Sequence, residues 1–122
     1  MILLFVVGSA GGIGAALRYA VDRAVTLRLA GPFPWGTTFV NVGGAFLLGV
    51  LAGLAWFHGL GARWGDVLGT GFSGGLTTWS TASWETVRLV ERGSHGEALF
   101  QAVGGLVAAA LAAAIGVAIA TA

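Results

Sequence analysis

Uncharged polar side chains gather in two stretches of an otherwise apolar sequence. Residues 71–85 read GFSGGLTTWSTASWE, and an earlier stretch carries Thr37 four residues before Asn41. Positions four apart share a helix face, so Thr37 and Asn41 would form a short line of hydrogen-bond donors. Such donors replace the water around a small anion without trapping it on a fixed charge. The pattern favours anion passage, and an asparagine that only bridges two helices is the alternative.

The stretch 71–85 is a poor sequence for a continuous helix. Two glycines, Gly74 and Gly75, are followed by Thr77 and Thr78, and glycine and threonine have low helix propensity. We expect a break at Gly74–Thr77 that frees backbone carbonyls, which a membrane tolerates only around protein, water or an ion. The alternative is an unbroken helix whose hydroxyls bond to their own backbone.

Polar residues recur at helical intervals of three and four beyond the predicted break. They are Thr77, Ser80, Thr81, Glu85 and Arg88. This hydroxyl stripe suits an anion that must lose its water and still be released. The ring edge of Trp79, on a neighbouring face, would add a weak positive field.

The composition indicates that lipid surrounds these segments. Hydrophobic residues make up 57% of the chain and charged residues 9%, whereas a soluble domain carries about 25% charged residues. The charge-free runs predict an all-α membrane protein of one domain, with four transmembrane helices over about residues 2–21, 35–57, 67–90 and 98–121. Four thin helices leave no room for an aqueous pore within one subunit, so we expect a conducting form to be an oligomer. Glycines four apart, Gly8 with Gly12 and Gly49 with Gly53, would provide close-packing faces.

Several other functions are disfavoured. No nucleophile, base and orienting group come together, so we do not expect an enzyme. A formal net charge of +1 gives no basic surface for nucleic acid. His58 and His95 lack clustered partners for a metal. Arg18, near the end of the first span, either extends to the membrane surface or attracts anions to a vestibule.

Three segments, in order along the chain, resemble the Fluc/CrcB fluoride channel family. They are GGIGAALRY at 11–19, GTTFVNVGGAF at 36–46, and GFSGGLTTWST at 71–81 followed by Glu85. The resemblance covers nearly the whole chain. It implies a fluoride-selective passive channel that exports fluoride across the inner membrane of a bacterial cell, built as an antiparallel, dual-topology dimer with two pores.

The resemblance also implies roles for particular residues. Asn41 would be the pore amide, with Ser80 and Thr81 as the pore hydroxyls. A structural sodium ion at the dimer centre would be held by backbone carbonyls from around Gly74 to Thr77. Arg18 and Glu85 match charged positions of the family, and their roles stay open.

The sequence departs from the family pattern at the pore. Where the family usually has two phenylalanines three residues apart, this chain has Trp79 and Ala82, and alanine offers no ring edge. Where the family often places tyrosine and serine in the fourth span, Gln101 is the main polar residue. A homodimer of this chain would therefore have pores short of polar lining.

The arginines also distribute unevenly. Loops one and three share one side of the membrane, and five of the six arginines lie in or near them, against Arg63 alone in loop two. The positive-inside rule then predicts termini outside. The altered pore lining and the uneven arginines are both compatible with a heterodimer, in which an oppositely oriented homologous subunit replaces the second copy of this chain.

Two alternatives to a self-sufficient fluoride channel remain open. One is a non-conducting partner subunit of a heterodimeric channel. The other is a small four-helix multidrug exporter, which usually needs a membrane-embedded carboxylate. Glu85 is the only candidate for that carboxylate, and it lies near a predicted span end.

Overall fold

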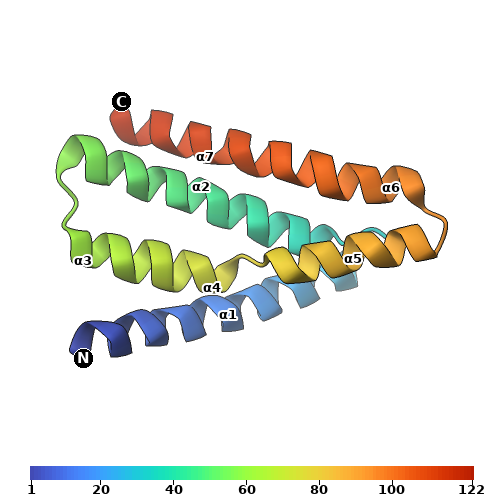
Figure 1. Cartoon of the computed structure of the whole chain (residues 1–122), viewed down its shortest axis with the longest axis horizontal. Helices are drawn as coiled ribbons and strands as arrows, with labels where there is room; N and C mark the ends of the chain where they lie inside the picture. Colours follow the sequence, from blue (N-terminus) through green and yellow to red (C-terminus); the bar gives the residue numbers. More distant parts are fainter.

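A computed structural model describes all 122 residues and consists of helices joined by short connections, without strands. The chain makes four antiparallel passes, and its N- and C-termini lie at the same end (Figure 1). The first two passes are α1 (Ile2–Arg28) and α2 (Trp35–His58). The third comprises α3 (Ala62–Trp64), the π-helical η1 (Gly65–Ser73), α4 (Gly74–Leu76) and α5 (Trp79–Glu91). The fourth comprises α6 (His95–Leu99), the π-helical η2 (Phe100–Gly104) and α7 (Gly105–Thr121).

Three uninterrupted helical passes are long and apolar enough to cross a membrane. They are Ile2–Arg28, Trp35–His58 and His95–Thr121. The third pass contains two shorter pieces on either side of an interruption. Only 18 of the 122 residues are buried, and large apolar side chains cover the outside. Water would solvate such an exterior poorly, so the chain is a multi-pass membrane protein whose outer face contacts lipid or another subunit.

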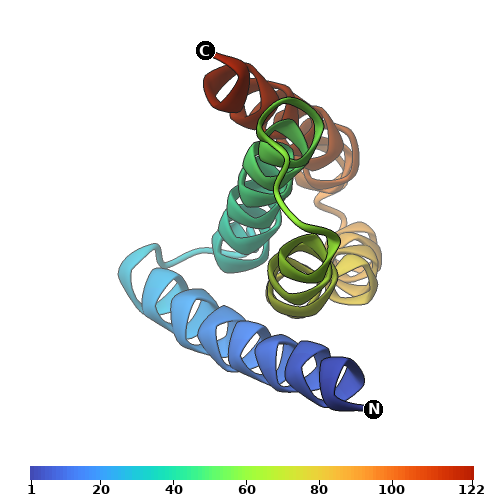
Figure 2. The ribbon, with the colours of Figure 1, turned by 90° about the vertical axis from the view of Figure 1, so that its left-hand side faces the viewer.

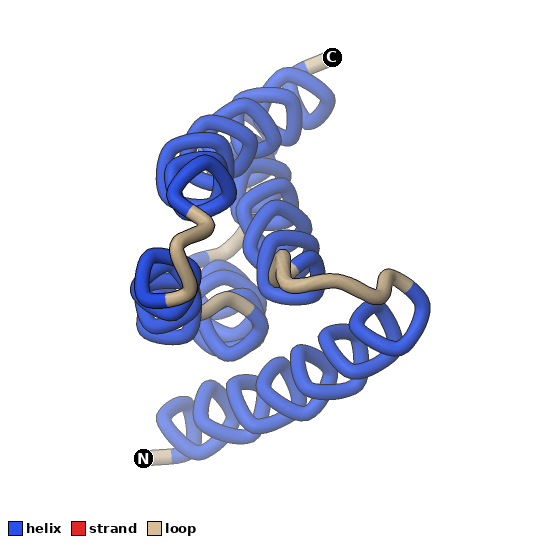
Figure 3. The backbone as a smooth tube through the Cα atoms, turned by 90° about the vertical axis from the view of Figure 1, so that its right-hand side faces the viewer, coloured by secondary structure: helices blue, strands red, loops and turns tan.

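The second pass occupies the middle of the bundle. Seen end on, α2 lies between α7 and the third pass, and α1 and α7 lie at opposite ends of the cross-section (Figure 2). The opposite end view gives the same arrangement and shows the connections that join the passes (Figure 3). α1 packs mainly on η1 and α4, and α2 packs along α7. Asn41 on α2 is therefore placed between the third and fourth passes.

Small residues let α2 and α7 approach closely. A Cβ atom on Gly49 would collide with the Ala113 carbonyl, and one on Gly116 would collide with the Phe46 carbonyl. Gly53 faces Ala120 in the same contact. Of the two predicted glycine pairs, Gly49 with Gly53 thus packs inside the subunit. Gly8 and Gly12 point to open space, and their neighbours Gly11 and Gly14 face the third pass instead.

The third helix is interrupted, and the interruption lies later than predicted. Gly74 to Leu76 are helical, and extended backbone occurs at Thr77 (φ −85°, ψ 159°) and Thr78 (φ −152°, ψ 118°). Gly74 and Gly75 therefore do not form the break, although Thr77 does. Gly75 stays helical where it packs against the backbone of Gly11, an approach that any larger residue would block.

Candidate functional site

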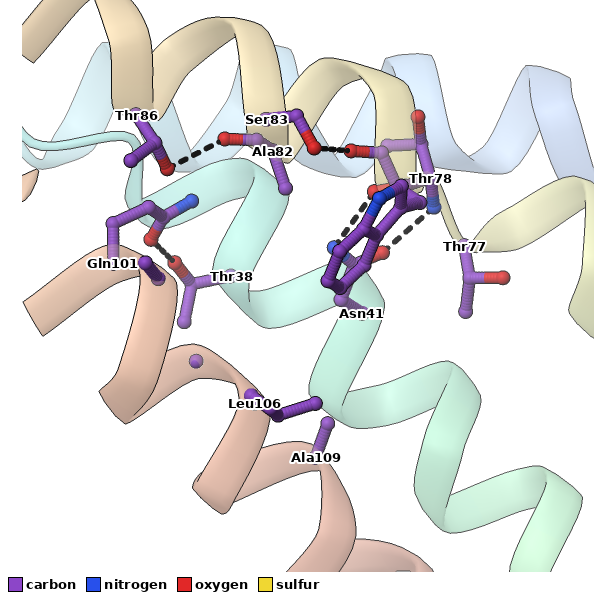
Figure 4. Close-up of a pocket in the computed structure, with 13 residues that line it drawn as sticks. Thr38, Asn41, Thr77, Thr78, Ala82, Ser83, Thr86, Gln101, Leu106 and Ala109 are labelled. Carbon is purple, nitrogen blue, oxygen red and sulfur yellow. Dashed lines mark hydrogen bonds between the residues drawn. The ribbon is translucent and has the colours of Figure 1, made fainter. Parts of the chain in front are cut away.

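Asn41 clamps the break in the third helix. Its Nδ2 donates to the Thr78 carbonyl oxygen at 2.9 Å, and its Oδ1 accepts from the Thr78 backbone N–H at 2.7 Å. Figure 4 shows this pair of bonds reaching from α2 to the extended segment. Since Thr78 is buried, both of its backbone groups would otherwise lack partners in a low-dielectric interior. Asn41 thus bridges two helices and also borders the cavity described below.

Two backbone amides at the break donate to side chains in place of helical carbonyls. In a continuous helix the Thr78 amide would donate to the Gly74 carbonyl, and the Thr81 amide would donate to the Thr77 carbonyl. Here the Thr78 amide donates to Asn41, and the Thr81 amide donates to the Thr78 hydroxyl at 3.2 Å. Gly74 and Thr77, the two predicted carbonyl ligands, are therefore among the residues whose carbonyls lack the partner that a continuous helix would supply.

Thr78 begins the second half of the third pass. Its hydroxyl caps α5 by accepting from the Thr81 amide, and it donates to the Thr81 hydroxyl at 3.0 Å. The Ser80 hydroxyl lies 3.4 Å from the same oxygen. Ser80 and Thr81 are thus grouped around the N-terminus of α5, which carries a partial positive charge. Neither of them lines the cavity on the other side of Asn41.

A cavity of about 440 Å³ lies between α2, α5 and the fourth pass. Its lining includes the predicted residues Asn41, Thr77 and Trp79, and Ala82 lies where the resemblance expects a ring. The other polar groups around it are hydroxyls and one amide, and no charged residue borders it. The complete lining is Thr38, Asn41, Thr77, Thr78, Trp79, Ala82, Ser83, Thr86, Gln101, Ala102, Gly105, Leu106 and Ala109.

Thr37 and Glu85 form a separate polar contact between α2 and α5. The Thr37 hydroxyl, which is 2% exposed, donates to Glu85 Oε1 at 2.9 Å. Glu85 Oε2 is buried without a hydrogen-bond partner. Thr37 therefore faces the carboxylate and lies outside the cavity lining, although it is one turn from Asn41 on α2.

The two arginines of interest lie away from the cavity. Arg18 is partly exposed on α1 and does not line it. The Arg88 guanidinium lies over the Trp84 ring, 5.2 Å from its centroid. Arg88 and Arg92 border a second hollow of about 160 Å³ with Glu85, at the end of the bundle opposite the termini (Figure 1).

Three features of the site could not be predicted from the sequence: the capping role of Thr78, the hydrogen bond of Thr38 and the position of Gln101 at the cavity. Gln101 is buried, at 6% exposed, and its Oε1 accepts from the Thr38 hydroxyl at 2.8 Å. Thr78 is adjacent to Thr77, and only the general preference of threonine for the N-cap position of a helix indicates its role. Thr38 gives no such signal, because its partner lies 63 residues away.

Comparison with known proteins finds similarity over nearly the whole chain. The family described as "CrcB-like protein, Camphor Resistance (CrcB)" matches residues 5–117. The chain is 44% identical over 115 residues to the "Fluoride-specific ion channel FluC 1" of Leifsonia xyli subsp. xyli, covering 94% of this chain and 84% of that protein. It is 45% identical over 128 residues to the protein of the same name from Frankia casuarinae, covering 98% and 95%. It is 48% identical over 101 residues to the "Fluoride-specific ion channel FluC" of Novosphingobium aromaticivorans, covering 80% and 79%.

Proposed function

The chain belongs to the Fluc/CrcB family, and from that premise we propose that it is a fluoride-selective passive ion channel. One observation carries the proposal furthest. A cavity bordered by amide and hydroxyl groups, with no charged side chain, adjoins a helix break in an otherwise apolar bundle. Uncharged donors in a low-dielectric setting compensate a small anion for lost water and still let it leave.

The pore is proposed to form where two subunits meet. The cavity borders α2, α5 and the fourth pass, and four helices enclose no complete passage within one chain. A second subunit in the opposite orientation would cover the open side and supply a second pathway by symmetry. That subunit is either another copy of this chain or a homologue. We place the channel in the inner membrane of a bacterial cell, where it would release fluoride from the cytoplasm.

A structural sodium ion fits the backbone at the break. The Gly74 and Thr77 carbonyls have lost their helical amides to Asn41 and Thr78. Backbone carbonyls freed at helix breaks coordinate sodium in membrane proteins. No cluster of three or more His, Cys, Asp or Glu residues offers another metal site. Two such carbonyls from each subunit would meet at the dimer centre, and the ion would neutralise their partial negative charges.

Ion efflux from liposomes tests the function directly. Purified protein should release fluoride at a rate far above that of chloride, and it should not move a quaternary ammonium cation. Chloride release as fast as fluoride would contradict selectivity. Quaternary ammonium transport without fluoride release would support the exporter alternative.

A partner subunit that does not conduct alone is the second candidate, because Ala82 leaves the cavity without a second aromatic ring. In that case the protein alone would pass no fluoride and would conduct when mixed with an oppositely oriented homologue. Ala82→Phe tests whether the absence of this ring limits conduction by the protein alone. If the missing ring limits conduction, this substitution should raise fluoride efflux from the protein alone. An unchanged rate would mean that the ring is not needed here.

A further inference from the structure

We propose that the hollow between α5 and the loop before α2 binds the phosphate group of an anionic phospholipid, and that Arg88 and Arg92 hold this phosphate. The inference goes beyond the proposed function, because it concerns the contact of the chain with the membrane and requires no ion to pass through the protein.

The hollow joins two arginines on α5 to a loop far away in the sequence. Its volume is about 160 Å³, and Arg88, Arg92, Trp84, Glu85 and Leu89 line it together with two prolines. Arg88 and Arg92 are four residues apart, so their side chains share one face of the helix. The prolines, Pro32 and Pro34, belong to the loop between α1 and α2 and have fixed φ angles.

Both arginines are available to an anion. Each is exposed, and neither forms an ion pair with a carboxylate of the chain. Glu85 is the one acidic residue at the hollow. Its Oε1 accepts from the Thr37 hydroxyl at 2.9 Å and its Oε2 is buried, so this carboxylate is paired with neither arginine. The hollow therefore presents two unpaired positive charges.

The chemistry of these arginines suits a phosphate. The Arg88 guanidinium lies 5.2 Å from the centroid of the Trp84 ring, and this cation–π contact restrains it. Arginine presents a planar fork of N–H donors that matches two oxygens of one phosphate group. Two such groups bordering one small hollow favour a phosphate over a spherical ion, which the fork does not fit.

The position of the hollow favours a phosphate carried by a lipid. It lies near the end of α5, at the end of the bundle opposite the termini (Figure 1). Trp84 is 61% exposed, and exposed tryptophans of membrane helices concentrate at the level of the lipid headgroups. Five of the six arginines lie in or near the loops at this end. Basic pockets on the arginine-rich, cytoplasmic side of membrane proteins bind anionic headgroups.

Lipid titrations of the purified protein in a neutral detergent, followed by native mass spectrometry, test the proposal. The wild type should bind phosphatidylglycerol more tightly than phosphatidylcholine, whose choline cation is repelled by the arginines. An arginine near an anionic lipid contributes about fivefold to the binding constant, so Arg88→Gln with Arg92→Gln should weaken phosphatidylglycerol binding by about 25-fold. Arg63→Gln removes an exposed arginine on α3, at the other end of the bundle, and should leave the affinity unchanged.

Three results would overturn the proposal. The first is equal affinity of the wild type for the two lipids. The second is an equal loss in Arg63→Gln and in the double variant, which would mean that lipid is attracted by overall charge and not by the hollow. The third is displacement of the lipid by glycerol phosphate at equal concentration, which would indicate a site for a free phosphate.

Size-exclusion elution in detergent shows whether the double variant is folded. If it is not, the two single variants replace it, each with an expected loss of about fivefold, and wild-type affinity in both would overturn the proposal. The titration does not depend on fluoride conduction, so this inference and the proposed function can fail separately.

Discussion

Asn41 connects the chemistry of one side chain to the shape of the third helix. Its carboxamide has the same donor and acceptor pattern as a peptide group, so it pairs with both backbone groups of Thr78. The bonds hold the extended backbone of a buried residue. A residue expected to contact the ion thus also maintains the break from which the site is built.

Asn41→Leu should therefore impair both stability and conduction. The substitution leaves the buried N–H and C=O of Thr78 without partners, at a cost of about 1–3 kcal/mol for each group. We expect a lower apparent Tm in detergent and slower fluoride efflux from liposomes. Phe39→Leu, an exposed change on the same helix, serves as the control. An unaltered Tm together with unaltered efflux in Asn41→Leu would contradict the clamp.

The contact between Thr37 and Glu85 makes a separate prediction. Thr37→Val should lower the apparent Tm, because it removes the only hydrogen bond to a carboxylate whose other oxygen is buried without a partner. Hydrogen bonds to charged groups contribute about 1.5–3 kcal/mol. Thr37→Ser keeps the hydroxyl and should melt close to the wild type. Equal melting of the valine and serine variants would show that the bond contributes nothing.

α2 packs closely along α7, and a matched pair of glycines on α2 tests this contact. Gly49→Val should reduce the yield and lower the apparent Tm of folded protein, because its Cβ would collide with the Ala113 backbone rather than with a movable side chain. Overpacking of this kind typically costs about 1–3 kcal/mol. Gly43→Val, on the same helix, has open space at its Cβ. Similar yields and melting for the two variants would contradict the close approach of α2 and α7.

The presence of the helix break could be predicted from the sequence, but its position could not. Helix propensity places the break at the glycines, since glycine is the weaker helix former. In the folded chain Gly75 allows close contact with Gly11 and remains helical. The break moves to Thr77 and Thr78 because Asn41, 37 residues earlier, bonds the Thr78 backbone. Contacts of that range leave no local pattern in the sequence.

The candidate site, too, could be predicted only in part from the sequence. Asn41 and the hydroxyl residues are recognisable because polar side chains are costly in a membrane helix and so draw attention individually. The hydrogen-bond partner of each of these side chains cannot be recognised from the sequence, because it depends on how each helix is rotated about its axis relative to its neighbours. Thr37 and Thr38 are adjacent, yet one bonds Glu85 on α5 and the other bonds Gln101 on η2. Helical periodicity alone does not distinguish these two directions.

The distribution of charge over the whole molecule bears on the identity of the second subunit. Arg28 ends α1 and Arg92 follows α5, at the end of the bundle away from both termini (Figure 1). Arg63 belongs to α3, which lies at the end of the bundle that holds the termini. Arginines favour the cytoplasmic side. A chain so biased would insert mainly with its termini outside, whereas an antiparallel homodimer needs both orientations in equal numbers.

Orientation in the membrane can be measured with two reporters fused to the C-terminus. One reporter is active only outside the cytoplasm and the other only inside it. If the arginine bias governs insertion, the outside reporter should dominate when the chain is expressed alone. Replacing Arg23 and Arg28 with serine should move the two signals toward equality, since it reduces the difference between the ends of the bundle. Equal signals from the unmodified chain would instead show dual topology. That result would remove the charge argument for an oppositely oriented homologue and favour a channel made of two copies of this chain.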